Sequence, residues 1–506
     1  MARFLLILLS AALYAMPFPP WNQAWSSWVA LLPFLSAIDG VAPTLSFWWG
    51  LLFGHLAHWA VAWWVPEAIA HYYRQPWWFA LGFAELTSPL FWSGYYALFA
   101  AFASYTQPLS RVPRMIVLAA GWVTCEFARA HLLTGAPWLM LGYALAPQLR
   151  LVQVADFGGV YLLSFLSALV NVAIADALLD PKHAFGDYRR WLVPAAVILV
   201  VFVSSYAYGS WRLARELPTE PAASVAIVQG NNQDGAYWRP GQYGKGLDRY
   251  LDLSVQALEE HHPELLIWPE AAVTMFLDHE PRHQALIRDV LTRGGADLIV
   301  GAPHYVDTDP ALPEFYNSVF YMTAAGITGR YDKVHLLPFV EYFPLKLDYV
   351  RRRFERVRSF VAGQDASLLE TRLGPVAMAI CFEAIFPDLV RRRVGAGAGA
   401  LVVLSNDIWL GDGAGAQQHL AQVTLRAIEN RVWVLRATTT GVSAVIDPYG
   451  RIVEQSQTFV PATLSASIVP LHIDTFYKRY GDVFAWGCVA ASVAAILVVP
   501  RRRRSI

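Results

Sequence analysis

The chain has 506 residues, of which 56% are hydrophobic and only 15% are charged. Soluble domains usually have about 25% charged residues, so this balance predicts long segments buried in lipid. Lys plus Arg equals Asp plus Glu at 39 each, which gives no support to nucleic-acid binding. The three cysteines are too few for a disulfide framework.

Eight apolar segments have about the length needed to cross a bilayer core of roughly 30 Å. The predicted spans are 4–18, 24–40, 44–66, 78–105, 113–132, 157–180, 190–210 and 482–500. The first could be a signal peptide, because Arg3 precedes a short apolar run. Leu13 occupies a position where a cleavage site needs a small residue, which favours an uncleaved span.

The distribution of positive charge predicts that both termini face the cytoplasm. Segments that would then lie inside carry Arg3, Arg111, Arg114, Lys182, Arg189, Arg190 and Arg501 to Arg504. The outer short loops would carry Arg74, Arg150 and Arg129. We therefore expect a seven-helix membrane domain over 1–214 and an extracytoplasmic domain over 215–480. A C-terminal helix and a basic cytoplasmic tail would follow over 481–506.

Four ionisable side chains lie inside the predicted spans: His55, His58, Glu85 and Glu126. Ionisable groups within a membrane are candidates for function, although interhelical hydrogen bonding is the favoured interpretation. The two histidines lie three apart on one helix face, which is too little for a metal site. No metal or cofactor is expected.

From about residue 220, short apolar strands alternate with amphipathic helices. The predicted strands are 224–229, 264–268, 297–301, 319–323, 327–332, 375–380, 400–405, 433–437, 443–446 and 451–455. The predicted helices are 246–260, 282–294, 386–396 and 417–431. This alternation predicts one α/β domain with helices covering a sheet.

Three reactive side chains follow strand-like runs in this domain: Glu270, Lys333 and Cys381. A carboxylate, an amine and a thiol are the parts of a base-activated nucleophile with a cation for an oxyanion. Cys381 stands where a strand gives way to a helix, whose N-terminus favours a thiolate. Walls formed by Trp268 and Pro269 would raise the pKa of Glu270 toward neutrality. Taken singly, Cys381 could be an inert thiol, Glu270 a loop acid and Lys333 a surface lysine.

The motifs around these residues resemble those of the nitrilase, or carbon–nitrogen hydrolase, superfamily. They are WPE ending at Glu270, Y-D-K-x-H-L-x-P around Lys333 and C-F-E starting at Cys381. The resemblance covers 220–470 and implies an αββα sandwich with a Glu-Lys-Cys triad. Together with the spans on either side, the chain resembles the apolipoprotein N-acyltransferase branch of that superfamily.

That resemblance implies that Cys381 takes an acyl chain from a phospholipid as a thioester. The chain would then pass to the α-amino group of an S-diacylglyceryl-cysteine at the N-terminus of an apolipoprotein. Glu270 would be the base and Lys333 the oxyanion stabiliser. The resemblance also implies a multi-pass protein of the bacterial inner membrane with a periplasmic catalytic domain. A monomer is expected.

Further site residues follow from the same motifs. The resemblance implies that Glu341 and Glu383 support the triad, and that Phe382 replaces a tyrosine found in many relatives. The substrate-binding candidates are Trp238, Phe382, Asn406, Trp409, Phe339 and Tyr342. Core packing, loop exposure and turn capping by Asn406 and Asp407 are the ordinary alternatives.

The apolar segment 335–347 contains Phe339 and Tyr342, and it is either packed on the domain or a lid that admits acyl chains. Two other functions remain open at this point. With water as acceptor, the protein would be a membrane-tethered amidase. A transporter with a degenerate nitrilase-like domain is the other alternative, which the intact triad disfavours.

Overall fold

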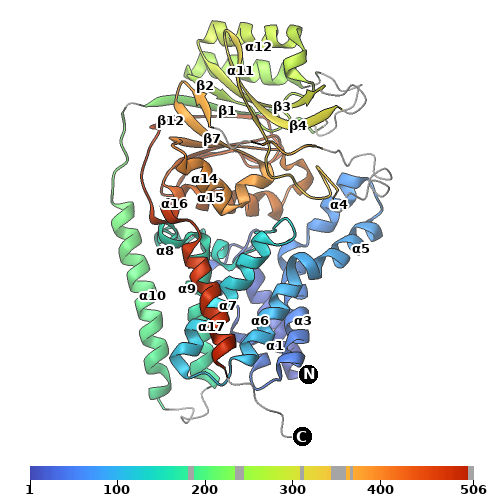
Figure 1. Ribbon diagram of the computed structural model, residues 1–506. Coiled ribbons are helices and arrows are strands. Elements are labelled where there is room, and N and C mark those ends of the chain that lie inside the picture. Colours follow the sequence, from blue (N-terminus) through green and yellow to red (C-terminus); the bar gives the residue numbers. More distant parts are fainter. Residues whose placement is uncertain are drawn as a thin grey trace. The chain divides into compact units, whose positions relative to one another are not determined.

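The computed structural model describes residues 1–179, 187–220, 222–233, 244, 246–307, 313–343, 360–364 and 368–499. The chain divides into two compact units (Figure 1). The first comprises Met1–Pro66, Pro76–Arg215 and the segment from Tyr480 onward, and it is helical. The second comprises Glu67–Gln75 and Glu216–Arg479, and it contains both sheets.

The helices of the first unit follow most of the predicted spans. They are α1 (Ala2–Ala15), η1 (Ala24–Trp28), α2 (Leu32–Ile38), α3 (Pro43–Ala62), α5 (Trp77–Ser88), η2 (Pro89–Ser93), α6 (Gly94–Tyr105), α7 (Arg111–His131), η3 (Leu141–Leu145), α8 (Leu149–Val152), α9 (Ala155–Leu179), α10 (Arg189–Leu213) and α17 (Val483–Val498). Within the described residues, two helices are long and apolar enough to cross a membrane by length and composition. These are α9 and α10, with mean hydropathy of 2.1 and 2.0.

The predicted span over 24–40 is not one continuous helix, because it consists of a short 3₁₀ helix, η1, and the seven-residue α2. Side chains of α9 form hydrogen bonds with the backbone between η1 and α2. The Leu31 amide donates to Asn171 Oδ1 at 2.7 Å, and Asn171 Nδ2 donates to the Ser27 carbonyl at 2.8 Å. Ser167 Oγ donates to the same carbonyl at 3.0 Å. Polar side chains of α9 therefore take the place of the backbone hydrogen bonds that a continuous helix over 24–40 would make.

The second unit contains two six-stranded sheets. The first has the order β12-β1-β2-β3-β4-β5, and the second has the order β11-β10-β9-β8-β7-β6. The strands are β1 (Ala223–Gln229), β2 (Leu265–Ile267), β3 (Asp297–Val306), β4 (Glu314–Thr323), β5 (Gly326–Asp332), β6 (Leu369–Thr371), β7 (Gly374–Ile380), β8 (Ala400–Ser405), β9 (Trp433–Thr438), β10 (Ala444–Ile446), β11 (Ile452–Gln455) and β12 (Ala462–Ile468). All ten predicted strands are confirmed, while β6 and β12 are additional.

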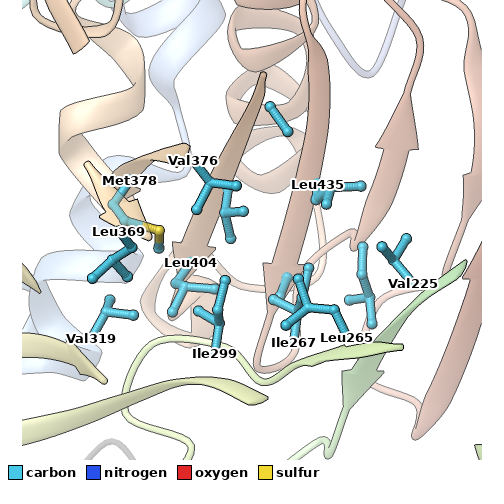
Figure 2. Packing of buried hydrophobic residues seen from close by; sticks show 14 of the residues in the cluster. Val225, Leu265, Ile267, Ile299, Val319, Leu369, Val376, Met378, Leu404 and Leu435 are labelled. Atoms are coloured by element: carbon cyan, nitrogen blue, oxygen red, sulfur yellow. The ribbon is translucent and has the colours of Figure 1, made fainter. Parts of the chain in front are cut away.

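The two sheets pack face to face around one apolar core. Figure 2 shows side chains of both sheets meeting there, among them Ile267 and Ile299 from the first sheet and Met378 and Leu404 from the second. Alternate residues point the other way, as the two-residue period of a strand requires. In β1, for example, Ile227 lies in this core, whereas Val228 lies under the helices of the first sheet.

Helices cover the outer face of each sheet, which gives four layers. On the first sheet these are α11 (Leu247–His261) and α12 (Pro281–Gly294), and on the second they are α14 (Pro387–Gly395) and α15 (Ala414–Asn430). The expected αββα sandwich is thus confirmed. The segment Glu67–Gln75, which includes most of α4 (Val65–Tyr73), joins this unit from the N-terminal part of the chain.

Candidate active site

Glu270, Lys333 and Cys381 each follow the end of a core strand, namely β2, β5 and β7. Their exposed fractions are 8%, 1% and 5%. Each lies close enough to the other two to influence their charge states. Because β2 and β5 belong to one sheet and β7 to the other, the face-to-face packing brings the three groups together.

Glu270 is held by two donors at its carboxylate. Asn317 Nδ2 donates to Oε1 at 2.7 Å, and the backbone amide of Asn406 donates to Oε2 at 2.7 Å. Burial raises the pKa of Glu270, and the like charge of Glu341 adds to this, while Lys333 opposes it. The expectation of a raised pKa is therefore confirmed, and its main cause is desolvation.

The turn that carries Glu270 passes very close to strand β3. A Cβ atom at Gly301 would lie 2.5 Å from the Pro269 carbonyl oxygen and 2.6 Å from the Glu270 Cα. A glycine is therefore required in β3 for this approach. Thr439 Oγ1 secures the turn from the other side by donating to the Glu270 carbonyl at 3.1 Å.

Lys333 forms a buried ion pair with Glu341. The Nζ–Oε2 distance is 2.8 Å, and the Leu337 amide donates to the same Oε2 at 2.7 Å. Burial alone would lower the pKa of Lys333, but Glu341 and then Glu270 raise it above its ordinary value. The raised pKa favours the charged form of Lys333.

Asn317 joins the two carboxylates of the site. Its Nδ2 donates to Glu270 Oε1 and, at 2.8 Å, to Glu341 Oε1. The backbone carbonyl of Asn317 also accepts from the Lys333 amide at 2.9 Å. Sequence analysis missed this residue, because an asparagine within a strand carries no signal of its own until its partners are known.

Cys381 has a left-handed backbone with φ of 51°. A non-glycine residue in this region is strained, and such strain is concentrated at functional sites. The residue starts a five-residue 3₁₀ helix, η7 (Cys381–Ile385), and the helix predicted over 386–396 follows it as α14. Burial raises the pKa of the thiol, Glu270 adds to this, and Lys333 opposes it. The expectation of a favoured thiolate is wrong, because burial outweighs the nearby cation.

Glu383 is fully buried and accepts hydrogen bonds from five groups. The donors are the Tyr331 hydroxyl at 2.9 Å, the amides of Val334, His335 and Ile380 at 2.9, 3.0 and 2.8 Å, and the Arg393 guanidinium at 2.9 and 3.1 Å. Burial alone would raise the pKa of Glu383, but Arg393 and the amides lower it below its ordinary value. The carboxylate thus ties η7 to the segment that follows Lys333.

Asn406, Trp409 and Phe382, which were predicted as substrate-binding residues, differ from one another in their contacts. Asn406 offers its backbone amide to Glu270, while its side chain accepts weakly from the Ile408 amide at 3.4 Å, a turn cap. Trp409 is half-buried. Phe382 packs with its ring centroid 4.9 Å from Phe386.

A buried ionic group that sequence analysis did not identify as such influences the Cys381 thiol. Asp407 accepts from Arg436 Nη2 at 2.5 Å and from Ser405 Oγ at 2.6 Å. His419 Nδ1 lies 3.3 Å from the same carboxylate. Burial would raise the pKa of Asp407, but Arg436 and His419 hold it well below the ordinary value.

The loop that carries Glu341 contacts helix α4. The hydroxyls of Tyr72 and Tyr73 donate to the carbonyls of Val340, at 3.3 Å, and Phe339. Phe339 and Tyr342 are half-buried in this loop. The predicted lid extends to residue 347, of which 344–347 lie outside the described residues, as does Trp238.

One group of potential metal ligands lies elsewhere in this unit. Asp278, His279 and His304 have ligand atoms within 4.8 Å of one another. His304 Nδ1 lies 2.5 Å from Asp278 Oδ2, and its Nε2 lies 2.6 Å from Arg330 Nη1. Both ring nitrogens therefore have partners, and one partner is a cation, so the arrangement favours an ion-pair network over a metal site.

Comparisons with known proteins match both units. The carbon-nitrogen hydrolase family model matches residues 224–475, and the model of the apolipoprotein N-acyltransferase N-terminal domain matches residues 10–173. The crystal structure of the C. elegans NitFhit protein is similar at 20% identity with a TM-score of 0.39, over 51% of this chain and 63% of that one.

The curated relatives cover nearly the whole chain. The apolipoprotein N-acyltransferase of Geobacter metallireducens is 33% identical over 99% of this chain and 96% of its own length. That of Bradyrhizobium diazoefficiens is 35% identical over 83% of this chain and 79% of its own length. The chain therefore belongs to the apolipoprotein N-acyltransferases, acyltransferases of lipoprotein biosynthesis within the carbon–nitrogen hydrolase superfamily.

Proposed function

We propose that the protein transfers an acyl chain from a phospholipid to the N-terminal amine of a diacylglyceryl-apolipoprotein through a thioester on Cys381. This would be the final step of lipoprotein maturation. The observation that carries the proposal is the burial of Glu270, Lys333 and Cys381 within one electrostatically coupled site. A base, a cation and a thiol in that arrangement suit acyl transfer through a covalent intermediate.

In the first half-reaction, Glu270 removes the proton of the Cys381 thiol as sulfur attacks the ester carbonyl of the phospholipid. The S–C bond forms, and Lys333 stabilises the oxyanion of the tetrahedral intermediate. The ester C–O bond then breaks. The departing alkoxide takes the proton from Glu270 and leaves as a lysophospholipid. The raised pKas of the thiol and of Glu270 support this assignment, because a protonated thiol needs a base.

In the second half-reaction, the α-amino group of the acceptor attacks the thioester carbonyl. Glu270 accepts the amine proton, Lys333 again faces the oxyanion, and the C–S bond breaks. The proton returns to sulfur, which regenerates the Cys381 thiol and releases the N-acylated lipoprotein. No proton or electron is gained or lost over the cycle.

The other polar residues position these groups. Glu341 orients Lys333 through the 2.8 Å ion pair, and Glu383 fixes η7 relative to the segment after Lys333. We assign the surfaces of Phe339, Tyr342, Phe382, Asn406 and Trp409, together with Trp238, to substrate binding. The aromatic members suit acyl chains, because they offer apolar area without a charge to desolvate.

Because the proposed substrates are lipids, we expect the protein to lie in a membrane. We propose eight spans, with seven before residue 215 and one at 482–500, and both termini in the cytoplasm. Residues 215–480 would then form a periplasmic catalytic domain of a monomer in the bacterial inner membrane. The lengths and apolar character of α9 and α10 support this topology, as do the positive charges of Arg111, Arg114 and Arg189.

The test is acylation of a synthetic diacylglyceryl-cysteine peptide by the purified full-length protein in phospholipid vesicles. We expect N-acyl peptide and one equivalent of lysophospholipid from the wild-type protein, and neither product from Cys381→Ala. Full turnover by Cys381→Ala would overturn the mechanism. Hydrolysis of small amides without lipid, and no lipopeptide product, would show a membrane-tethered amidase instead.

A further inference from the structure

Ser405 ends strand β8, next to the strand that leads to Cys381. Strands β7 and β8 are parallel neighbours, and the last pair in their register is Ile380 with Leu404. The residues that follow this pair, Cys381 and Ser405, therefore come from strands about 4.8 Å apart. Ser405 is fully buried, and η7 packs against β8. The Ser405 hydroxyl is close enough to the Cys381 thiol to influence its charge state.

The Ser405 hydroxyl has one proton, and Asp407 accepts it. The distance from Ser405 Oγ to Asp407 Oδ1 is 2.6 Å, and both side chains are buried. An ionised carboxylate cannot donate, so the proton in this hydrogen bond comes from the serine. The bond is charge-assisted, and it is therefore stronger than a bond from the same hydroxyl to a neutral thiol. While Asp407 holds this proton, the hydroxyl has none to donate to sulfur.

Arg436 and His419 favour the ionised form of Asp407. Arg436 Nη2 donates to Asp407 Oδ2 at 2.5 Å, and His419 Nδ1 lies 3.3 Å from Oδ1. Burial alone would raise the pKa of Asp407, but these two groups hold it well below its ordinary value. The His419 ring also interacts with the Cys381 backbone, and burial and then Arg436 lower its pKa, which favours a neutral ring. Arg436 is therefore the counter-ion of Asp407.

The charged groups around the thiol act in opposite directions. Burial raises the pKa of the thiol, Glu270 adds to this, and Lys333 opposes it. Asp407 raises it further, whereas a hydrogen bond donated to sulfur by Ser405 lowers it. On η7 itself, the Glu383 carboxylate is occupied by an arginine ion pair at 2.9 Å. Asp407 and Ser405 thus have opposite effects on sulfur, and the hydrogen bond between them couples these effects.

We propose that Asp407 is a positioning residue that holds the Ser405 proton away from Cys381, so that the thiol stays protonated until Glu270 accepts its proton. This deepens the proposed function and rests on it, because Cys381 and Glu270 keep the roles given there. A protonated thiol reacts slowly with electrophiles other than the substrate, since the thiolate is the nucleophile. Asp407 acts through Ser405 and takes no part in bond making.

The test is the rate at which iodoacetamide alkylates Cys381 in the full-length protein, followed by peptide mass spectrometry without any lipid substrate. For the wild type, we expect the rate to rise about tenfold per pH unit between about pH 6.5 and about pH 9. The reason is that the thiolate fraction of a mostly protonated thiol rises tenfold with each unit. A rate that does not change with pH would mean a resting thiolate and would overturn the proposal.

Asp407→Asn should raise the alkylation rate at about pH 8 roughly threefold. The neutral amide competes less well than a carboxylate for the Ser405 proton, and a negative charge near sulfur is lost, so the thiolate fraction should rise about tenfold. The weaker nucleophilicity of a thiolate with a lower pKa offsets part of this gain. A rate that stays unchanged or falls in a folded Asp407→Asn protein would contradict the proposal.

Asp297→Asn is the matched control for the loss of a buried carboxylate. Asp297 is also buried, and it accepts from the Tyr321 hydroxyl at 2.6 Å and from Arg372 Nε at 2.9 Å. It begins β3, whereas the site lies beyond the carboxyl ends of the strands. This variant should lower the melting temperature and leave the alkylation rate unchanged. An equal rise in rate in both variants would show a general loosening of the unit and would count against Asp407.

Ser405→Ala tests the direction of the hydrogen bond without breaking the ion pair. If Asp407 holds the proton, sulfur loses no donor, and the alkylation rate should stay within about twofold of the wild type. In the Ser405→Ala background, Asp407→Asn should then raise the rate less than it does alone, because part of its effect passes through the hydroxyl. A fall of about threefold or more in Ser405→Ala alone would mean that the serine already donates to sulfur, which is incompatible with the proposal.

Thioester formation gives an independent readout and separates this inference from the proposed function. In the Glu270→Gln protein, adding Asp407→Asn should raise the rate of Cys381 acylation by phospholipid about threefold, because a more acidic thiol depends less on the base. A folded double variant that is slower than Glu270→Gln would indicate a structural role only. The alkylation assay needs no lipid, so its results support or contradict the inference even if the wild-type protein forms no thioester.

Discussion

Two buried charges, one in each unit of this chain, differ in how fully they are hydrogen-bonded. In the α/β unit, Glu383 is surrounded by five donor groups, three of them backbone amides. In the helical unit, Arg129 has a single hydrogen bond and two nitrogens without any acceptor among the described residues. Glu270 lies between these extremes, with two donors at its carboxylate.

The difference indicates what each charge can do. A fully satisfied buried ion holds the fold in one arrangement and has no remaining capacity for a ligand. A partly satisfied group such as Glu270 can exchange a proton, because its few hydrogen bonds do not commit it to one charge state. The first predictions below test buried carboxylates on this scale.

Glu270→Gln should have the largest effect on activity. The amide keeps the size of the side chain but cannot accept the thiol proton, so kcat/KM should fall about 10²- to 10⁴-fold. The rate of thioester formation is measured in phospholipid vesicles. Glu314→Gln, at an exposed carboxylate that accepts from the nearby Tyr316 hydroxyl, is the control and should retain wild-type activity. A Glu270→Gln protein with a normal rate would remove Glu270 from the role of base.

Glu383→Ala should have the largest effect on stability. It leaves Arg393 buried without its carboxylate, so the free energy of unfolding should fall by about 3–5 kcal/mol. Denaturant unfolding of the full-length protein in detergent measures this. Asp388→Ala removes a partly exposed ion pair with Arg391 and Arg392, and it should cost less than about 1 kcal/mol. Equal losses in the two variants would mean that the network around Glu383 contributes no more to stability than a partly exposed ion pair.

Glu341→Gln should alter the pH dependence as well as the rate. The Glu341 charge raises the pKa of Glu270, so its removal should lower that pKa. A base works only when deprotonated, and the rate therefore falls as the pH drops through the pKa of Glu270. We expect the acidic limb of the kcat/KM profile to lie at lower pH in this variant than in the wild type. A shift to higher pH would contradict the charge coupling.

The same variant should lower the plateau rate roughly 10- to 100-fold, because Lys333 loses the partner that orients it. The pH profile separates this effect from unfolding, since a destabilised protein would lose activity without moving the limb. Circular dichroism at each pH provides the control.

Tyr73→Phe should have a smaller effect. It removes one hydrogen bond to the Phe339 carbonyl, and with it part of the link between α4 and the loop that carries Glu341. We expect a loss of about three- to tenfold in kcat/KM, consistent with about 1 kcal/mol for one hydrogen bond. Tyr316→Phe, at a surface hydroxyl bound to Glu314, should be neutral. Equal effects of the two variants would argue against a positioning role for α4.

Phe382→Tyr should have the smallest effect. Phe382 packs beside Phe386 and His335 through its ring, and a tyrosine keeps that ring. We expect a change of less than about twofold in kcat/KM, within the range of conservative surface changes. A marked gain in rate would show that the hydroxyl has a role this chain has lost.

The fold of the α/β unit was largely predictable, and its exceptions have clear causes. Strand β8 is buried on both faces and shows the continuous apolar run typical of a parallel strand. Strand β12, Ala462–Ile468, has a half-polar sequence that resembles a loop, and only its pairing with β1 makes it a strand. In the helical unit, the break in 24–40 depends on Asn171 and Ser167, which lie more than 100 residues away.

For the site, local motifs sufficed to find Glu270, Lys333 and Cys381, because each is marked by its own neighbours in sequence. Asn317 and Tyr73 were not predictable, since their roles depend on contacts with distant segments. The raised pKa of the Cys381 thiol also could not be foreseen. The strand-to-helix junction suggested a thiolate, but the depth of burial that overrides it is a property of the packed sheets.

The central claim is that Cys381 carries the acyl chain between the two substrates. The most direct measurement is peptide mass spectrometry of the full-length protein after incubation with phospholipid alone. The account predicts one acyl group on the peptide that contains Cys381, which hydroxylamine removes and the diacylated lipopeptide discharges. Acyl lipopeptide product from wild-type protein that never carries an acyl group on Cys381 would contradict it.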